Sequence, residues 1–269
     1  MGEDLGKPYY GYKGTRYVTG VLIGIGIIGI ALGITFSILA YSTWVLILCW
    51  VLGVILLAFG IFWHLTMSFT ADPKKMESIK DSFLDELGTI WDGKGKVLDI
   101  GTGRGWVAIE IAKRFPETRV LGIDIWTKFF TLMGQTKAGA EKNAIISNVS
   151  DRCTFQYGNA LDLPFKDGEF RLVVSSFTFH EVRAPDRKVL FNEVARVLAP
   201  GGTFLILDFF SIGFVLKGYK VTSVEELLEK VQQLGIEDAK IKPLKEAGID
   251  LGRFYRHFWE CDFLSGRKV

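Results

Sequence analysis

The fold is decided by the stretch Lys96-Val97-Leu98-Asp99-Ile100-Gly101-Thr102-Gly103-Arg104-Gly105. Its first half is a short apolar strand, and its second half carries glycines at alternate positions directly before a helical pattern that begins at Trp106. Glycines in such a turn let a ligand approach bare backbone at the N-terminus of a helix. The stretch therefore predicts a site for a nucleotide-like ligand, with a purely structural turn as the alternative.

Two details distinguish the kind of ligand. The glycine spacing is G-x-G-x-G, whereas dinucleotide-binding turns have G-x-G-x-x-G. Asp99 lies two positions before the first glycine, where its carboxylate can attract an ammonium group. Asp124 ends the next predicted strand, and a carboxylate at that place can accept both hydroxyls of a ribose. The glycine spacing and Asp99 favour S-adenosylmethionine over a dinucleotide.

The rest of the large domain alternates between strand and helix patterns. Strands are predicted at 96–100, 119–125, 153–157, 171–175 and 203–208, helices at 106–115, 128–147, 185–198 and 223–234, and an antiparallel pair of strands within 239–263. An amphipathic helix precedes them, with Asp72 as its N-cap and its end near Leu87. Such alternation predicts a mostly parallel sheet with helices on both faces.

The N-terminal quarter has a different composition. Two apolar stretches, 17–40 and 44–63, contain no charged residue, and each reaches the roughly 20 residues that a helix needs to cross a bilayer. A short polar break separates them, so we expect a two-helix transmembrane hairpin, with a buried hairpin in a soluble domain as the alternative. Lysine and arginine precede the first stretch and follow the second but are absent between them. The positive-inside rule then predicts a two-pass membrane protein whose N-terminus and large domain are cytoplasmic.

Aromatic side chains at the ends of these stretches fit the membrane interface: Tyr9, Tyr10, Tyr12, Tyr17, Trp44 and Trp63. The predicted organisation is a tail at 1–16, the hairpin at 17–63, a linker with the amphipathic helix at 64–94, and the catalytic domain at 95–269. Every cofactor motif follows Lys96, so we expect a chain without its first 63 residues to bind the cofactor. The net charge of +2 gives no case for a nucleic-acid partner, and the three cysteines have no paired spacing that would indicate a disulfide or a metal site.

Five segments together resemble the successive motifs of class I methyltransferases: the glycine loop, Asp124, GNALDLPF at 158–165, FHEV at 179–182 and RVLAPGG at 196–202. The similarity is closest to the branch that includes the ubiquinone/menaquinone C-methyltransferases, and it covers about residues 81–209. The resemblance implies a Rossmann-like, doubly wound seven-stranded sheet with a reversed last strand. It places Asn159 where the family has an acidic residue that contacts adenine, and Ala160 beside the base. The hairpin lies outside the family pattern.

The candidate cofactor-binding residues are Asp99, Gly101, Thr102, Gly103, Gly105, Asp124, Ile125, Asn159, Ala160 and Ser175. Methyl transfer from a sulfonium is an in-line displacement that needs alignment and no metal, and it needs a base only if the acceptor loses a proton. His180 and Glu181 follow the fourth strand and are the candidate catalytic residues, with His180 the better base. A structural histidine is the alternative, and Asp208 is a weaker candidate.

The acceptor is the least determined feature. The apolar run at 209–216 is interpreted either as a buried segment after the fifth strand or as an acceptor pocket at the membrane surface. Together with the hairpin it favours a lipophilic small-molecule acceptor, and the bilayer is the expected partner. The anchor also fits a role in localisation or in pairing with another membrane protein. A membrane-tethered NAD-dependent oxidoreductase and a non-catalytic membrane module with a nucleotide-binding fold remain the alternative functions.

Overall fold

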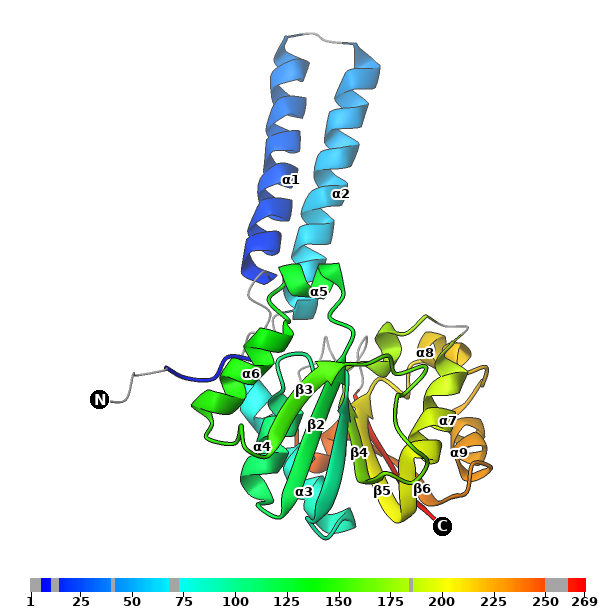
Figure 1. Cartoon of the computed structure of the whole chain (residues 1–269). Helices are drawn as coiled ribbons and strands as arrows, with labels where there is room; N and C mark the ends of the chain where they lie inside the picture. The colour runs from blue at the N-terminus through cyan, green and yellow to red at the C-terminus, as the bar shows by residue number, and fades with distance from the viewer. Residues whose placement is uncertain (1–5, 11–14, 40–41, 68–72, 184–185, 250–260) are drawn as a thin grey trace, which may run out of the picture. The chain divides into compact units, whose positions relative to one another are not determined.

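The computed structural model describes residues 6–10, 15–39, 42–67, 73–183, 186–249 and 261–269. They form two compact units (Figure 1). One contains the sheet and its helices together with the segment that ends at Tyr10, and the other is built from the two long N-terminal helices. Tyr12 and the predicted cap Asp72 lie outside the described residues, as does the side chain of Tyr17.

The sheet has seven strands in the order β3-β2-β1-β4-β5-β7-β6. Their bounds are β1 Gly95–Ile100, β2 Thr118–Asp124, β3 Cys153–Tyr157, β4 Phe170–Ser176, β5 Leu198–Asp208, β6 Ile236–Pro243 and β7 Asp262–Lys268. β7, the last strand of the chain, runs antiparallel to both β5 and β6, and the pairs from β3 to β5 are parallel. The predicted seven-stranded, doubly wound sheet with a reversed last strand is confirmed.

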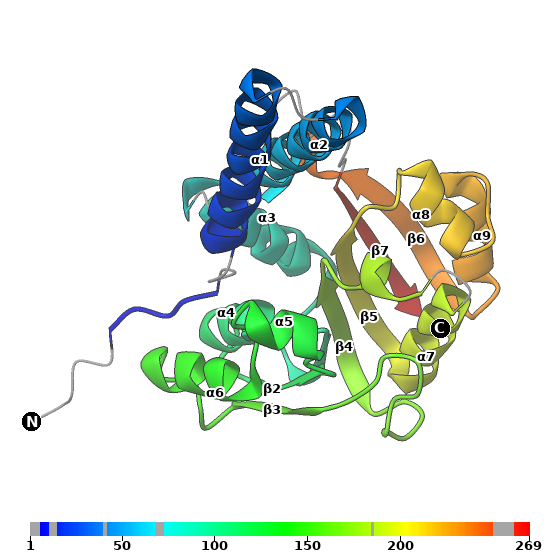
Figure 2. The same ribbon diagram turned by 90° about the horizontal axis from the view of Figure 1, so that it is seen from above.

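Helices cover both faces of this sheet (Figure 2). On one face lie α3 (Pro73–Ile90), α4 (Trp106–Arg114) and α6 (Lys137–Ile146), and on the other lie α7 (Arg187–Val197) and α9 (Val224–Gln232). Because both faces are covered, the central strands are largely buried: the last four residues of β1 are all buried, and one of them is Asp99.

One predicted helix is divided in the structure, and the final antiparallel pair extends beyond its predicted range, since β6 begins at Ile236 and β7 ends at Lys268. The helix predicted at 128–147 is two helices, α5 (Lys128–Leu132) and α6, because Gly134 adopts a φ of +87° and Thr136 begins a new helix by accepting the Gly139 N–H at 3.0 Å. The apolar run at 209–216 is largely buried, and a short helix, α8 (Gly213–Gly218), begins within it. The buried-segment interpretation of that run fits the structure.

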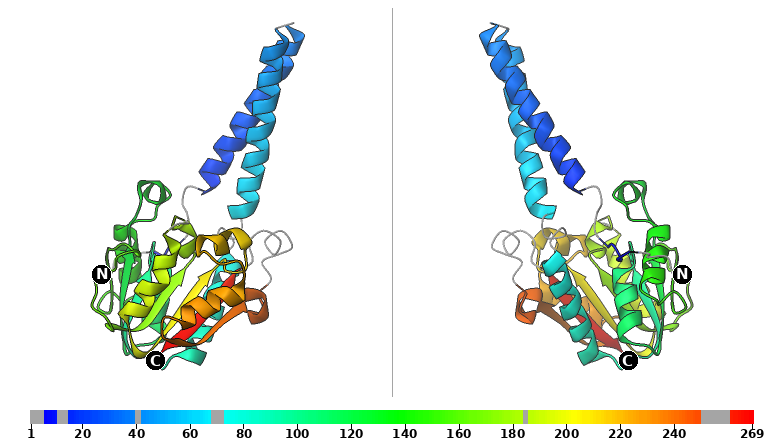
Figure 3. Two further views of the ribbon diagram at one scale, coloured as in Figure 1. Left: turned by 90° about the vertical axis from the view of Figure 1, so that its right-hand side faces the viewer. Right: turned by 90° about the vertical axis from the view of Figure 1, so that its left-hand side faces the viewer.

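The second unit consists of α1 (Thr15–Ile38) and α2 (Thr43–Met67), which run side by side (Figure 3). Glycines let their backbones approach: a Cβ on Gly29 would lie 2.9 Å from the Cα of Gly53, and one on Gly26 would lie 2.7 Å from the Leu57 nitrogen. By contrast, Gly20 and Gly24 face open space. Both helices are long and apolar enough to cross a membrane, and many of their large side chains are exposed.

Candidate cofactor and acceptor site

The loop after β1 is a tight turn held against the end of β2. The N–H groups of Gly101 and Thr102 both donate to the Ile123 carbonyl, at 2.8 and 2.9 Å. Gly101 and Gly105 have φ values of +72° and +80°, which favour glycine. A Cβ on Gly101 would lie 2.1 Å from the Thr178 hydroxyl oxygen, and one on Gly105 would lie 2.7 Å from the Phe155 ring. These two glycines are therefore required by close packing within the protein itself.

Gly103 differs from the other two glycines of the loop, Gly101 and Gly105. Its φ is +54°, and a Cβ there would meet only the end of the Gln135 side chain, with the Oε1 atom at 2.8 Å. No backbone or ring closes this position within 4 Å. The backbone at Gly103 is thus the part of the loop that is bare enough for a ligand to lie against it.

Asp99 lies beneath the loop rather than at its surface. Its side chain is buried, with 1% of the residue exposed, and its Oδ2 accepts the Thr102 hydroxyl at 2.7 Å. Burial raises the pKa of Asp99 to about 7, while the Thr102 hydroxyl lowers it. The attraction of an ammonium group by Asp99 remains a prediction. In the structure, one oxygen of the carboxylate is already bound to the Thr102 hydroxyl.

Asp124 lies at the carboxyl end of β2 and faces the loop. One carboxylate oxygen accepts the Gly103 N–H at 2.9 Å, and the other accepts the Trp126 N–H at 2.7 Å. The Trp126 indole N–H in turn donates to the Gly103 carbonyl at 2.9 Å. Burial raises the pKa of Asp124, and its backbone donors oppose that rise. Each carboxylate oxygen keeps a further lone pair, so the pair of oxygens can still accept two hydroxyl groups.

The remaining predicted cofactor residues surround this edge of the sheet. Ile125 follows Asp124 and is exposed, and Ala160 is half-buried. The amide oxygen of Asn159 accepts the Leu161 N–H at 3.0 Å, so it shapes its own turn. Ser175 is fully buried and donates to the Ile100 carbonyl at 2.7 Å, which joins β4 to β1. For Asn159 and Ser175 the structure shows an intramolecular role, and direct cofactor contacts stay predictions.

These residues fit the nucleoside and amino-acid ends of S-adenosylmethionine. Asp124 offers acceptors for the ribose hydroxyls, and Gly103 offers uncovered backbone beside them. Sequence patterns alone did not single out Thr178 and Gln135, whose side chains complete the walls of the loop from distant parts of the chain. Among the residues that the structure describes, no group of three or more His, Cys, Asp or Glu side chains is arranged to hold a metal ion.

A second polar cluster lies at the ends of β4 and β5. His180 belongs to the short 3-10 helix Phe179–Glu181, and its Nδ1 lies 2.7 Å from Asp208 Oδ1. Its Nε2 lies 3.1 Å from Glu181 Oε1. The other oxygen of Asp208 accepts the backbone N–H groups of Phe179 and His180, at 2.8 and 3.3 Å. Asp208, considered a weak candidate from sequence, is thus the fully buried acceptor around which this segment is built.

The charge state of His180 follows from these partners. Burial disfavours the imidazolium, but Asp208 and then Glu181 outweigh it and raise the pKa of His180 to about 9. The imidazole is therefore mainly protonated at pH 7. The general base predicted from sequence requires the neutral form, so the geometry favours a cationic hydrogen-bond donor at this position.

Arg187 and Tyr219 support the same segment from the helices behind it. The Arg187 guanidinium is buried and donates to the carbonyls of His180, Val182 and Val215, which fastens the 3-10 helix to α7 and α8. The Tyr219 phenol is also buried, which raises its pKa well above the ordinary value, and the charge of Asp208 adds to that rise. The hydrogen bonds of Arg187 therefore anchor the backbone of His180 and Val182.

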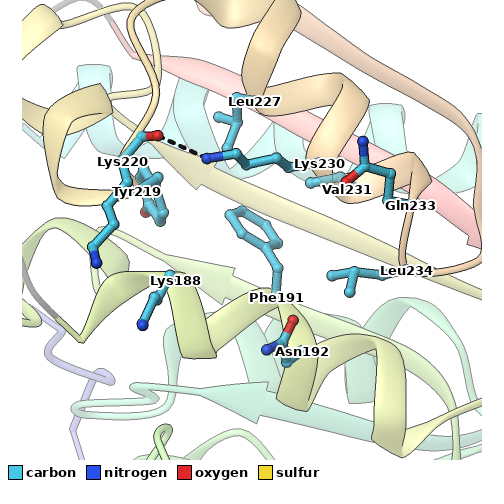
Figure 4. Close-up of a pocket in the computed structure, with 10 residues that line it drawn as sticks. All are labelled: Lys188, Phe191, Asn192, Tyr219, Lys220, Leu227, Lys230, Val231, Gln233 and Leu234. Atoms are coloured by element: carbon cyan, nitrogen blue, oxygen red, sulfur yellow. Dashed lines mark hydrogen bonds between the residues drawn. The ribbon is translucent and has the colours of Figure 1, made fainter.

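A cavity of about 310 Å³ opens between α7 and α9 (Figure 4). The rings of Phe191 and Tyr219 line it with Leu227, and Lys188, Lys220 and Lys230 lie around it. The Lys230 amine donates to the Lys220 carbonyl at 2.7 Å. None of the predicted site residues lines this cavity, which lies among α7, α9 and the segments beside them and not at the carboxyl ends of β1 and β2.

Comparison with known proteins agrees with the fold and with the predicted cofactor. Residues 97–202 match the family described as "Methyltransferase domain". The ubiquinone/menaquinone biosynthesis C-methyltransferase of Geotalea daltonii is 37% identical over 123 residues, which cover 45% of this chain and 48% of that protein. The 27-O-demethylrifamycin SV methyltransferase of Amycolatopsis mediterranei is 31% identical over 174 residues, which cover 61% and 59%. The chain thus spans about half the length of the curated relatives it matches.

Among solved structures, the phosphoethanolamine N-methyltransferase 2 of Haemonchus contortus in complex with S-adenosyl-L-methionine shares the fold. Its TM-score is 0.52 at 19% identity, over 70% of this chain and 52% of that one. The chain therefore contains a class I S-adenosylmethionine-dependent methyltransferase domain. This finding disfavours the NAD-dependent oxidoreductase and the non-catalytic module.

Proposed function

We propose that the chain is a membrane-anchored methyltransferase that transfers a methyl group from S-adenosylmethionine to a lipophilic small molecule. The observation that carries the catalytic part is the carboxylate of Asp124, which faces the bare backbone of Gly103 at the end of β2. The anchor is supported by the two apolar helices α1 and α2 and their exposed side chains. Basic residues flank them on the side of the termini, which supports a cytoplasmic catalytic domain.

The chain's own groups have three tasks in this reaction. S-Adenosylmethionine supplies an activated methyl group on a positively charged sulfur. The glycine loop and Asp124 hold the cofactor in a fixed direction, and alignment of the methyl group with the acceptor is the main contribution that such a transfer needs. The buried phenylalanines after β5 exclude water from the neighbourhood of His180, whose ring lies 4.7 Å from that of Phe209.

His180 and Glu181 are proposed to act on the acceptor. An imidazolium fixed by Asp208 can donate through Nε2 to an oxygen of the acceptor in place of Glu181. Glu181 is half-exposed, so its carboxylate is free to move aside and to take the proton of an acceptor that must lose one. In such a reaction the acceptor–methyl bond forms, the sulfur–methyl bond breaks, and the acceptor's proton passes to Glu181.

The lipophilic acceptor rests on the anchor, because tethering raises the concentration of the enzyme at the membrane surface. The test is to reconstitute the full chain into vesicles, add S-adenosylmethionine labelled in its methyl group and a lipid extract of the host, and extract the label into organic solvent. We expect label in the organic phase, strongly reduced in Asp124→Ala. Asp81→Ala, which removes an exposed carboxylate on α3, is the matched control and should retain activity.

Two results would contradict the proposal, and they are distinct. If the full chain does not bind S-adenosylhomocysteine, the cofactor assignment is wrong for this protein. If it binds the cofactor but methylates only water-soluble acceptors, with vesicles making no difference, the lipophilic acceptor is wrong and the anchor serves localisation or a membrane partner.

A further inference from the structure

The segment ahead of the first long helix is docked on the methyltransferase domain. We define residues 8–10 as the N-terminal strap. The Tyr9 N–H donates to the amide oxygen of Asn143 on α6 at 3.1 Å, and the Asn143 amide nitrogen donates back to the Tyr9 carbonyl at 3.0 Å. One side chain therefore pairs with both backbone groups of Tyr9, in the way that a neighbouring strand would. This reciprocal pairing fixes the direction of the strap on the domain.

Arg104 of the cofactor loop holds the same backbone from the other side. Its Nε donates to the Tyr9 carbonyl at 2.5 Å, and its guanidinium lies over the Tyr9 ring, 5.4 Å from the centroid. The residue is buried, and burial lowers the pKa of its guanidinium. Gly139 on α6 leaves the room for it, since a Cβ there would lie 2.8 Å from Arg104 Nη1. A buried cation at this place has the strap as its hydrogen-bonding and aromatic partner.

Tyr10 extends the contact to a third element. The Lys80 ammonium of α3 lies 4.6 Å from the centre of its ring, and its hydroxyl lies beside that of Ser147 after α6. Burial raises the pKa of the Tyr10 phenol well above its ordinary value. The strap thus joins α3, α6 and the cofactor loop, although it is far from all of them in sequence.

The contacts that Asn143 and Arg104 make with the strap lie next to Gly103, whose backbone faces the proposed cofactor. Asn143 also donates to the Arg104 carbonyl at 3.0 Å, and Arg104 stands between Gly103 and Gly105. The Gly103 N–H is the group that Asp124 binds. The conformation of the loop at Gly103 is therefore held by the hydrogen bond from Gly103 to Asp124. It is also held through the next residue, Arg104, which Asn143 and the strap contact. Loops with left-handed residues have alternative conformations, and such external contacts select one of them.

We propose that the N-terminal strap positions the cofactor loop, with Arg104 and Asn143 as the positioning residues through which it acts. The inference rests on the cofactor site proposed above. It refines the expectation that a chain without its first 63 residues binds the cofactor, because such a chain lacks the strap and should bind more weakly. Since α1 begins at Thr15, only residues 11–14 connect the strap to the first long helix, so the anchor and the cofactor loop are linked by a short length of chain.

The test measures S-adenosylhomocysteine affinity by calorimetry on the full chain in detergent. Asn143→Ala, Arg104→Met and deletion of residues 2–10 are each expected to weaken binding about tenfold, which corresponds to about 1.4 kcal/mol. The KM for S-adenosylmethionine should rise by the same factor while kcat at saturation stays within about twofold, because the loop is re-ordered once the cofactor is bound. Lys142→Ala, an exposed neighbour of Asn143 on α6, is the matched control and should change neither value.

A double variant separates positioning from direct contact. In the chain that lacks residues 2–10, Arg104→Met should have less than about a twofold further effect, since the strap contacts that it would remove are already absent. An equal loss in both backgrounds would show that Arg104 contacts the cofactor itself and would overturn the proposal. A lower melting temperature with unchanged affinity would also overturn it, because the strap would then only stabilise the fold. If the deletion does not fold, Tyr9→Ala replaces it. This variant removes the ring over Arg104 but keeps the backbone hydrogen bonds of the strap, so we expect a smaller loss of affinity than tenfold, and Arg104→Met should then have a smaller effect than in the unaltered chain. Loss of binding in the unaltered chain would instead refute the proposed function.

Discussion

Replacing Asp208 by Asn should change how the stability of the protein depends on pH. The carboxylate is fully buried and lies 2.7 Å from the His180 ring. Burial lowers the pKa of His180, but Asp208 and Glu181 more than compensate and raise it to about 9. Compared with an ordinary histidine at about 6.5, this corresponds to about 3 kcal/mol, since one pKa unit is about 1.4 kcal/mol. Glu181 contributes a part of this figure and is unaffected by the substitution.

The direction of this pH dependence follows from the raised pKa of His180. A group that binds its proton more tightly in the folded state stabilises the protein fully below its unfolded pKa, near 6.5, and loses that contribution as pH rises through 9. Asp208→Asn should therefore be most destabilising near pH 6, by about 2–3 kcal/mol more than at pH 10. A pH-independent loss of about 1–3 kcal/mol is added, because the new amide nitrogen cannot accept the N–H groups of Phe179 and His180.

The assay is guanidinium unfolding of the full chain in detergent at pH 6, 8 and 10, followed by near-ultraviolet circular dichroism. A titration of the His180 ring by NMR, assigned with His180→Gln, gives the pKa directly. Asp81→Asn is the control and should show no such pH dependence. A His180 pKa near 6.5, or a loss of stability that is the same at all three pH values, would refute the argument that Asp208 holds a cation.

Three further predictions concern the cofactor and the anchor. Asp124→Ala should weaken S-adenosylhomocysteine binding by about 1–3 kcal/mol with the melting temperature little changed, and a result in which only the melting temperature falls would make Asp124 structural. Gly101→Ala should destabilise the domain by at least about 2 kcal/mol in chemical denaturation, because the new Cβ would meet Thr178 at 2.1 Å, and Thr178→Gly should recover part of the loss if that contact is its cause. Replacing residues 11–72 by a flexible linker, with the N-terminal strap retained, should preserve cofactor affinity. It should sharply lower the turnover of lipophilic acceptors in vesicles. An equal loss of activity on water-soluble acceptors would instead make the hairpin part of the catalytic fold.

The features that the sequence predicted correctly are those that depend on residues close together in the chain. An apolar strand, alternate glycines and a helix in direct succession define the loop at residues 96–105, and Asp124 follows from the end of the next strand. Strand and helix patterns are local because each depends on backbone hydrogen bonds and a repeating apolar face. The same locality explains the errors: the periodicity of 128–147 did not reveal that Gly134 and the Thr136 cap divide it into two helices.

Contacts between distant parts of the chain were decided only by the tertiary structure. Thr178 lies against Gly101, Asp208 fixes His180, and the N-terminal strap meets Asn143 across 134 residues of sequence. Thr178 and Asn143 belong to no motif that the sequence analysis identified, and Tyr9 was interpreted as an interfacial aromatic from its position alone. The order of the strands brings β1, β4 and β5 together, and with them the segments that follow each strand. Which side chains then meet depends on that packing, because hydrogen bonds and close contacts act over a few ångströms in space and carry no signature along the chain.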